Sequence, residues 1–352
     1  MADVFDDTRL DDPDVLASVD PMLRRLAEAG ARVRTEAGES EAALRLLERE
    51  TAPRAIVAAG ADARLLRAVL EPWCPVPFVA WPGPSLPGWA GALDLVVVLA
   101  PGGGDVQAFS AVREAVRRGC SLITACPPHS LLAEHAAGRH STVLPTQTDD
   151  TLAVAVVMLQ GLHGMGVGPE IDPDQVARVL DDVAIACSPL CDISTNPAKE
   201  LALALADSTP LVWGGSVLAA RAARRVAEAV RRETGRPALA ADAEHLHPVL
   251  AATRSRDLFA DPLSEDGAVP LRPGLLVLDD GTEESSIREQ RGWLTSTAEA
   301  RDVHVQTISA VEGPEVARYA ALLSTGLYTA TYLGVGLHGA AATDRGTAEG
   351  TV

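Results

Sequence analysis

The same order of sequence patterns occurs twice along this chain: a short apolar strand, a glycine-containing turn, and a helical pattern. In the first half, residues 54–59 and 94–100 are apolar runs that lead into such turns. In the second half, residues 210–213 and 274–278 do the same. Continuous apolar strands that alternate with helices are typical of parallel sheets covered on both faces. The sequence therefore predicts an α/β fold built by internal duplication.

Each half also contains a third strand pattern, at residues 121–125 and 303–308. We expect two three-layer αβα domains of the flavodoxin-like or Rossmann-like kind, each with a mainly five-stranded parallel sheet. The predicted boundaries are a polar N-terminal arm at 1–14, a first domain at 15–168, a helical connection at 169–195, a second domain at 196–338, and a flexible tail at 339–352.

The charge balance narrows the classes of partner. Lys and Arg total 30 and Asp and Glu total 48, so the formal net charge is −18. This argues against binding to nucleic acid or to an anionic membrane, both of which require a basic surface. The acidic start has no signal-peptide pattern, and the apolar run 152–159 is too short to span a bilayer. Together with five scattered cysteines, this predicts a cytoplasmic protein without disulfides.

Four turns follow the strand patterns, at residues 60–62, 102–105, 214–216 and 280–282. Turns that lead into helix N-termini expose backbone N–H groups to phosphate or carboxylate. The simpler interpretation is that each glycine only makes a tight strand–helix connection. None of the turns matches the P-loop or the G-x-G-x-x-G dinucleotide fingerprint, so we expect no nucleotide cofactor.

Candidate acid–base groups follow the long helical pattern 217–232. Glu233 ends that helix, and the sequence Glu-His-Leu-His at 244–247 lies in the connection to the next strand. The latter could hold a metal, transfer a proton through His247, or be an exposed polar loop. Cys187 and Cys191 are four residues apart without a second Cys or His pair nearby, so we expect no metal site.

Three segments carry a resemblance to a known family: Thr-Asn-Pro-Ala-Lys-Glu-Leu-Ala at 195–202, Thr-Pro-Leu-Val-Trp-Gly at 209–214, and Gly-Leu-Tyr-Thr-Ala-Thr-Tyr-Leu at 326–333. Together they resemble the second half of the bifunctional phosphoglucose/phosphomannose isomerases, within the sugar isomerase (SIS) domain superfamily. The resemblance is best over 185–335 and only architectural over 20–165. It implies two SIS domains, a homodimer with its active site at the subunit interface, and a small-molecule sugar phosphate as ligand.

The resemblance also implies roles for individual residues. Glu233 matches the base that moves a proton between C1 and C2 of the open-chain sugar, and His247 matches the ring-opening histidine. The substrate-binding residues that we expect from the turns and the Asn-Pro-Ala-Lys segment are Gly60, Gly102, Gly103, Gly104, Gly214, Gly215, Ser216 and Lys199.

The chain departs from the family pattern where phosphate should bind. The hydroxyl-rich phosphate loop of the family is replaced by Pro-Gly-Gly-Gly-Asp at 101–105, and the family's C-terminal lysine is missing. Asp62 and Asp105 would repel a phosphate placed at about 4 Å by roughly 1 to 4 kcal/mol each. Three hypotheses follow: an aldose–ketose isomerase of hexose 6-phosphates, a catalytically inactive sugar-phosphate sensor or scaffold, and a structural dimer without a ligand.

Overall fold

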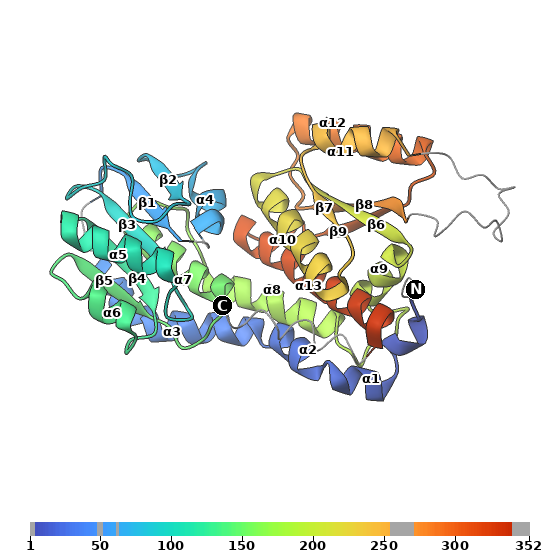
Figure 1. Cartoon of the computed structure of the whole chain (residues 1–352), viewed down its shortest axis with the longest axis horizontal. Helices are drawn as coiled ribbons and strands as arrows, with labels where there is room; N and C mark the ends of the chain where they lie inside the picture. Colours follow the sequence, from blue (N-terminus) through green and yellow to red (C-terminus); the bar gives the residue numbers. More distant parts are fainter. Residues whose placement is uncertain (1–3, 48–51, 61–62, 254–270, 340–352) are drawn as a thin grey trace, which may run out of the picture. The chain divides into compact units, whose positions relative to one another are not determined.

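The computed structural model describes residues 4–47, 52–60, 63–253 and 271–339, and the chain divides into two compact units. Unit 1 combines residues 1–27 with 179–352, and unit 2 comprises residues 28–178. The predicted boundaries placed residues 15–27 in the first domain, whereas these residues belong to the unit of the second half. Each unit contains one sheet with helices on both of its faces (Figure 1).

Unit 2 contains the predicted five-stranded parallel sheet, and its strands lie in the order β2-β1-β3-β4-β5. Its strands are β1 (Ile56–Ala59), β2 (Phe78–Trp81), β3 (Leu95–Leu99), β4 (Ser121–Cys126) and β5 (Ser141–Pro145). Its helices are α3 (Ala29–Leu47), α4 (Ala63–Leu70), α5 (Val106–Arg118), α6 (Leu131–Ala136) and α7 (Thr151–Gly164). Every residue of β1 and β3 is buried, which explains their unbroken apolar sequences.

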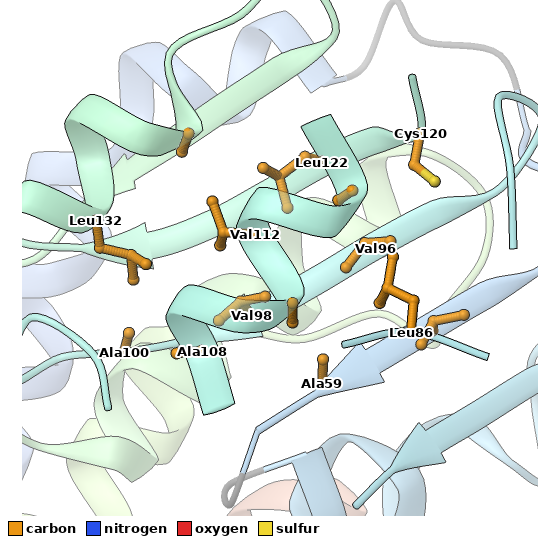
Figure 2. Close-up of a cluster of buried hydrophobic side chains, with 14 of the residues drawn as sticks. Ala59, Leu86, Val96, Val98, Ala100, Ala108, Val112, Cys120, Leu122 and Leu132 are labelled. Carbon is orange, nitrogen blue, oxygen red and sulfur yellow. The ribbon is translucent and has the colours of Figure 1, made fainter. Parts of the chain in front are cut away.

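One face of this sheet packs against α5 and α6. Figure 2 shows the resulting core, in which Val96 and Val98 of β3 point toward Ala108 and Val112 of α5. The cluster consists of aliphatic side chains and cysteines, in keeping with an aromatic content of only 3%. The core therefore holds β3 and α5 together on either side of the turn at residues 100–105.

Unit 1 contains a parallel sheet in the order β7-β6-β8-β9, with four strands among the described residues rather than the predicted five. Its strands are β6 (Ser208–Gly214), β7 (Leu239–Ala240), β8 (Arg272–Asp279) and β9 (Val305–Ser309). Its other elements are η1 (Asp7–Leu10), α1 (Pro13–Ser18), α2 (Asp20–Ala27), α9 (Pro197–Leu205), α10 (Val217–Thr234), α11 (Ala243–Ala251), α12 (Ser285–Ala300) and α13 (Glu315–His338). Helix α8 (Pro173–Ala186) crosses the division between the units.

Helices α9, α10 and α13 cover one face of the unit 1 sheet, and α11 and α12 cover the other (Figure 1). The face under α11 and α12 has its own core, in which Trp213 and Val277 contact Leu246 and Ile287. By length and composition α13 is the one described helix that would span a membrane, but 89% of its most apolar window is buried in the protein. It therefore serves as a core helix of unit 1.

The N-terminal segment, predicted as a polar arm, packs against the end of α13. Leu10 is fully buried, and the Arg9 guanidinium donates to the carbonyls of Gly336 and Leu337 at 3.0 and 3.1 Å. These contacts satisfy carbonyl groups that the last turn of a helix leaves without partners. Of the predicted flexible tail, residues 340–352 lie outside the described residues.

Candidate functional site

Both sheets have a topological switch point, and the described residues of the four predicted turns lie at these two places. Of the turn at 60–62 only Gly60 is described, and Asp62 lies outside the described residues. In unit 2 the chain leaves β1 toward β2 on one side, and continues from β3 to β4 and β5 on the other. In unit 1 it leaves β6 toward β7, and continues from β8 to β9 in the opposite direction. Open α/β sheets bind their ligands outside the carboxyl ends of the strands at such points. The β1–β3 and β6–β8 switch points are therefore the candidate sites.

The unit 2 switch point is lined by glycines in conformations that other residues rarely adopt. Gly60 follows β1 with φ +99°, and Gly103 and Gly104 follow β3 with φ +91° and +94°. No atom of the described residues lies within 4 Å of where a Cβ would stand at Gly60 or Gly102. The positive φ values fit the turn role of the glycines, and the space beside Gly60 and Gly102 is open; their binding of a substrate stays a prediction.

The acid of this turn is Asp105, which caps helix α5. Its Oδ1 accepts from the Ala108 N–H at 2.8 Å, so the carboxylate lies at the positive end of a 13-residue helix. Ser130 caps α6 in the same way, and its Cβ lies 4.0 Å from a Cβ built on Gly103. Ser130 therefore places a polar side chain beside the glycine turn.

The unit 1 switch point is closed by contacts within the chain. The Ser216 hydroxyl donates to Oδ2 of Asp280 and accepts from the Ala219 N–H at 3.0 Å. The other oxygen of Asp280 accepts from the Thr282 N–H at 3.3 Å and from its hydroxyl at 2.8 Å. Asp280 is only 7% exposed. Asp280, in the turn after β8, thus accepts the hydroxyl of the residue that caps α10.

Gly214 and Gly215 serve close packing at this place. A Cβ on Gly214 would lie 2.2 Å from the backbone of Ala219, and one on Gly215 would lie 2.3 Å from the Ile287 side chain. Neither glycine adopts a positive φ. The structure therefore assigns these two predicted binding residues to the contact of β6 with α10 and α12.

Two arginines complete the network around Asp280. Arg291 makes a bidentate ion pair with Asp279 at 2.6 and 2.7 Å, and Nη1 of Arg318 donates to the Asp280 carbonyl. The Nε atoms of both arginines are buried without a hydrogen-bond partner among the described residues. The unit 1 switch point thus contains two acids and two arginines in one network.

Lys199, predicted to bind substrate, lies in the interior of unit 1. Its ammonium group donates to Asp11 Oδ1 at 2.7 Å and to the carbonyls of Pro189 and Cys191 at 3.1 and 2.8 Å. The side chain is fully buried. A lysine ammonium has three N–H donors, and all three are used, so none is left for a substrate.

The Asn-Pro pair before Lys199 explains this placement. Asn196 caps α9 by accepting from the backbone of Ala198 and Lys199 at 3.0 and 3.1 Å, and Pro197 takes the first helical position. Tyr332 packs in the same region and donates to the Cys187 carbonyl at 2.7 Å. The Asn-Pro-Ala-Lys segment, which carries part of the family resemblance, therefore makes structural contacts within unit 1.

Glu233 and His247 lie on opposite faces of the unit 1 sheet. Glu233 ends α10 on the α13 side, where its carboxylate accepts from Arg232 at 2.8 Å and its Cβ lies 3.3 Å from a Cβ built on Gly334. His247 lies on α11, where its ring stacks on Trp293 of α12 with centroids 3.9 Å apart. The Glu-His-Leu-His sequence is thus helical, not a loop. One chain does not bring these two side chains to a common cleft.

Glu233 is also remote from the predicted binding turn of its own unit. Glu233 lies seventeen positions beyond Ser216 along α10, and an α-helix rises 1.5 Å per residue, so the two residues are about 25 Å apart. A hexose phosphate is much shorter than this. A site that uses Glu233 therefore cannot use Ser216 of the same chain.

The cysteines offer no activated nucleophile at either switch point. Burial raises the pKa of the Cys126 thiol at the end of β4, and a hydrogen bond with Ser130 only partly opposes this. Burial also raises the pKa of Cys187 to about 12. Both groups are thus neutral thiols at pH 7. Among the described residues no three His, Cys, Asp or Glu side chains gather as a metal site.

Residues 194–342 match the family model described as the bacterial phospho-glucose isomerase C-terminal SIS domain. The resemblance to the SIS superfamily is confirmed. No protein of curated function matches the sequence. The matched residues include Lys199, Ser216, Glu233, His247 and Asp280.

Several solved structures share the fold of this chain at low sequence identity. The C-terminal domain of glucosamine-fructose-6-phosphate aminotransferase from Francisella tularensis has a TM-score of 0.62 at 13% identity, covering 90% of this chain and 95% of that one. Tagatose-6-phosphate ketose/aldose isomerase from Escherichia coli has 0.60 at 13% identity, covering 91% and 93%. A glucose-6-phosphate isomerase like protein from Thermus thermophilus has 0.50 at 16% identity, covering 86% and 91%. These identities support the two-sheet α/β fold alone.

Asp280, Thr282 and Arg318 are not among the site residues predicted from the sequence. Asp280 and Thr282 belong to one of the four predicted turns. The available signal was position: an acid directly after β8 stands next to the Ser216 turn, because β6 and β8 are neighbours in the sheet. Arg318 carries no local signal, because it lies on α13 and its partner, the Asp280 carbonyl, is 38 positions earlier in the chain.

Proposed function

We propose that this protein binds a hexose phosphate at the β1–β3 switch point of unit 2. The observation that carries the proposal is the open glycine turn, in which Gly60 and Gly102 present backbone with no described atom within 4 Å of a Cβ position. The N-terminus of α5 lies directly behind this turn and favours an anionic group. The fold is shared with two structures whose names contain a hexose phosphate.

Asp105 sets the strength of this binding. Its carboxylate already accepts one N–H of the first turn of α5, and it would stand beside the bound phosphate. Two like charges about 4 Å apart repel by roughly 1 to 4 kcal/mol at effective dielectric constants between those of water and of a protein surface. We therefore expect weaker phosphate binding than in a site lined by hydroxyl groups.

Isothermal titration of the full chain with fructose 6-phosphate, glucose 6-phosphate and mannose 6-phosphate tests the proposal. We expect one of these ligands to bind, and the same sugar without phosphate to bind at least tenfold more weakly. Asp105→Asn keeps the helix cap and removes the charge, so it should raise the affinity roughly five- to tenfold. Glu39→Gln, an exposed position on α3, is the matched control and should leave the affinity unchanged. Absence of binding in both the wild type and Asp105→Asn would refute the proposal.

A second candidate function is aldose–ketose isomerisation, with Glu233 as the base and His247 as the ring-opening acid. The observation in its favour is that the family match spans both residues. Because one chain holds them on opposite faces of a sheet, this reaction requires Glu233 of one copy and His247 of a second copy in a homodimer. The reaction needs one carboxylate base and one acid at the ring oxygen, which this pair would supply.

A coupled assay of glucose, mannose and fructose 6-phosphate interconversion separates the two functions. If isomerisation occurs across two copies, Glu233→Gln and His247→Asn are each inactive, and mixing the two variants restores up to about a quarter of the activity through mixed dimers. No turnover by a wild-type protein that binds the ligand would leave binding alone as the function. Restored activity would support the shared site, and none would refute it.

A further inference from the structure

The carboxylate of Asp280 is bound in unit 1 in the way that an external anion would be. One oxygen receives the Ser216 hydroxyl, and the other receives the N–H and the hydroxyl of Thr282. Hydroxyl and backbone N–H donors that converge on one anionic group are the donors that phosphate groups use in proteins. Asp280 is 7% exposed, so its carboxylate is bound by groups of the protein and has little contact with water.

The position of this carboxylate is the one at which the topology favours an anion. It lies at the β6–β8 switch point, where it bonds to Ser216, the N-cap of the 18-residue helix α10. The positive end of a helix attracts negative charge from any source, including a side chain of the same protein. Asp280 therefore satisfies at this point the same electrostatic demand that a ligand phosphate would satisfy.

We propose that Asp280 is the specificity-determining residue of the unit 1 switch point: its carboxylate takes the place of a phosphate group and excludes phosphorylated ligands from unit 1. The chain then binds one hexose phosphate, in unit 2, and not one in each unit. The statement about unit 2 rests on the proposed function, whereas the exclusion from unit 1 rests on the hydrogen bonds of Asp280.

The arginines nearby show what removal of this carboxylate would leave. Arg291 is paired with Asp279, and Arg318 is held by the Asp280 carbonyl, which any replacement side chain retains. Without the Asp280 carboxylate, two guanidinium groups would face one acid, and the site would carry an excess positive charge. The buried Nε donors of Arg291 and Arg318 have no partner among the described residues. An anion that enters from solvent at this place would meet this excess positive charge.

Titration calorimetry of full-length Asp280→Ser with inorganic phosphate and with fructose 6-phosphate tests the proposal. Compared with the wild type, we expect one additional phosphate site per chain, with an affinity at least tenfold above any that the wild type shows at this place. The double variant Ser216→Ala/Asp280→Ser should lose this gain. Glu312→Ser, which removes an exposed acid just beyond β9, is the charge control and should gain no site. No additional site in a folded Asp280→Ser, or the same gain in Glu312→Ser, would overturn the proposal.

A second variant keeps the test decisive if Asp280→Ser does not fold. Thr282→Val removes a hydroxyl that bonds to Asp280 and keeps the side-chain shape. Because no ligand phosphate uses this hydroxyl, the sugar-phosphate affinity should stay within twofold of the wild-type value. A fivefold loss in folded Thr282→Val would show that unit 1 binds the ligand and would refute the proposal. If the wild type binds no sugar phosphate, the proposed function fails, while the difference between Asp280→Ser and wild type still tests the exclusion.

Discussion

The two switch points have the same topology and different contents. In unit 2, glycines with positive φ leave the backbone open beside the N-terminus of α5. In unit 1, the turn residues Ser216 and Thr282 carry hydroxyl groups where the unit 2 turns carry glycines, but both hydroxyl groups are bonded to Asp280. Under the two proposals, the number of hydroxyl groups in a turn does not decide whether it binds a phosphate. The proposals make the deciding feature the side chain of the protein that is already bonded to those hydroxyl groups.

The comparison also separates the fold from the function. Both units are α/β sheets with helices on both faces, and the fold by itself supports several activities. The differences lie in a few residues directly after β1, β3, β6 and β8. Variants of the described contacts can therefore test whether unit 1 is a structural unit and unit 2 the binding unit.

The largest expected effect comes from Lys199→Met, because unit 1 depends on internal polar contacts. The substitution leaves Asp11 and the carbonyls of Pro189 and Cys191 without their donor. Asp11 is half-exposed and regains water, so we expect a loss of about 3 kcal/mol in the free energy of unfolding, at the lower end for a buried pair. Urea denaturation followed by circular dichroism measures this loss.

Arg67→Met is the matched control for Lys199→Met. Arg67 lies on α4 and makes an exposed ion pair with Glu71. Removal of this pair should change stability by less than about 0.5 kcal/mol. The sugar-phosphate affinity of Lys199→Met should equal that of the wild type under conditions in which the variant is folded. Full stability combined with a loss of affinity would instead make Lys199 a binding residue.

The strands and the helices that follow them could be predicted from the sequence because each carries its own local signal. The apolar run 94–100 contains β3, and Val106–Arg118 is helix α5, with Asp105 as its cap and Gly119 at its end. The four turns were predictable for the same reason. Their arrangement as two switch points follows from the order of the strands, which no local pattern encodes.

The second expected effect concerns the glycine turn of unit 2. Gly103→Ala places a side chain on a residue with φ +91° and should lower the free energy of unfolding by about 1 to 2 kcal/mol. Gly102→Ala, at a neighbouring position with ordinary φ and open space, should cost less than about 0.5 kcal/mol. Thermal unfolding of both variants measures the difference. Equal effects would show that the turn conformation does not require glycine.

The remaining residues could not be placed from the sequence, because their contacts are made by segments far apart in the chain. Arg9 bonds to the end of α13, more than 300 positions away, so the N-terminal segment was predicted as a detached arm. Lys199 was assigned to a ligand because a buried ammonium partnered by Asp11 has no local signature. Glu233 and His247 are close in sequence, but α10 and α11 pack on opposite faces of the sheet.

A third, smaller effect is alkaline destabilisation of unit 1 through Cys187. Burial raises its pKa from 9.0 to about 12 in the folded protein. Between these values the unfolded chain releases the thiol proton and the folded chain keeps it, so stability falls as pH rises from 9 toward 12. By pH 10 the loss should be about 1.4 kcal/mol relative to pH 8. Urea midpoints of the wild type and Cys187→Ala over pH 8 to 10 measure it, and equal slopes in both proteins would contradict the assignment.

The smallest effect is expected from Trp293→Leu, on the α11–α12 face of unit 1. The substitution removes the stack with His247 and keeps an apolar side chain at a position that is 42% exposed. Stability should fall by about 0.5 kcal/mol, and the sugar-phosphate affinity should not change if the ligand binds in unit 2. If the wild type isomerises its ligand, the loss of the ring that orients His247 should lower kcat and leave KM unchanged. A weaker affinity would instead place the ligand against this face of unit 1, and would remove the distinction between a binding unit and a structural unit.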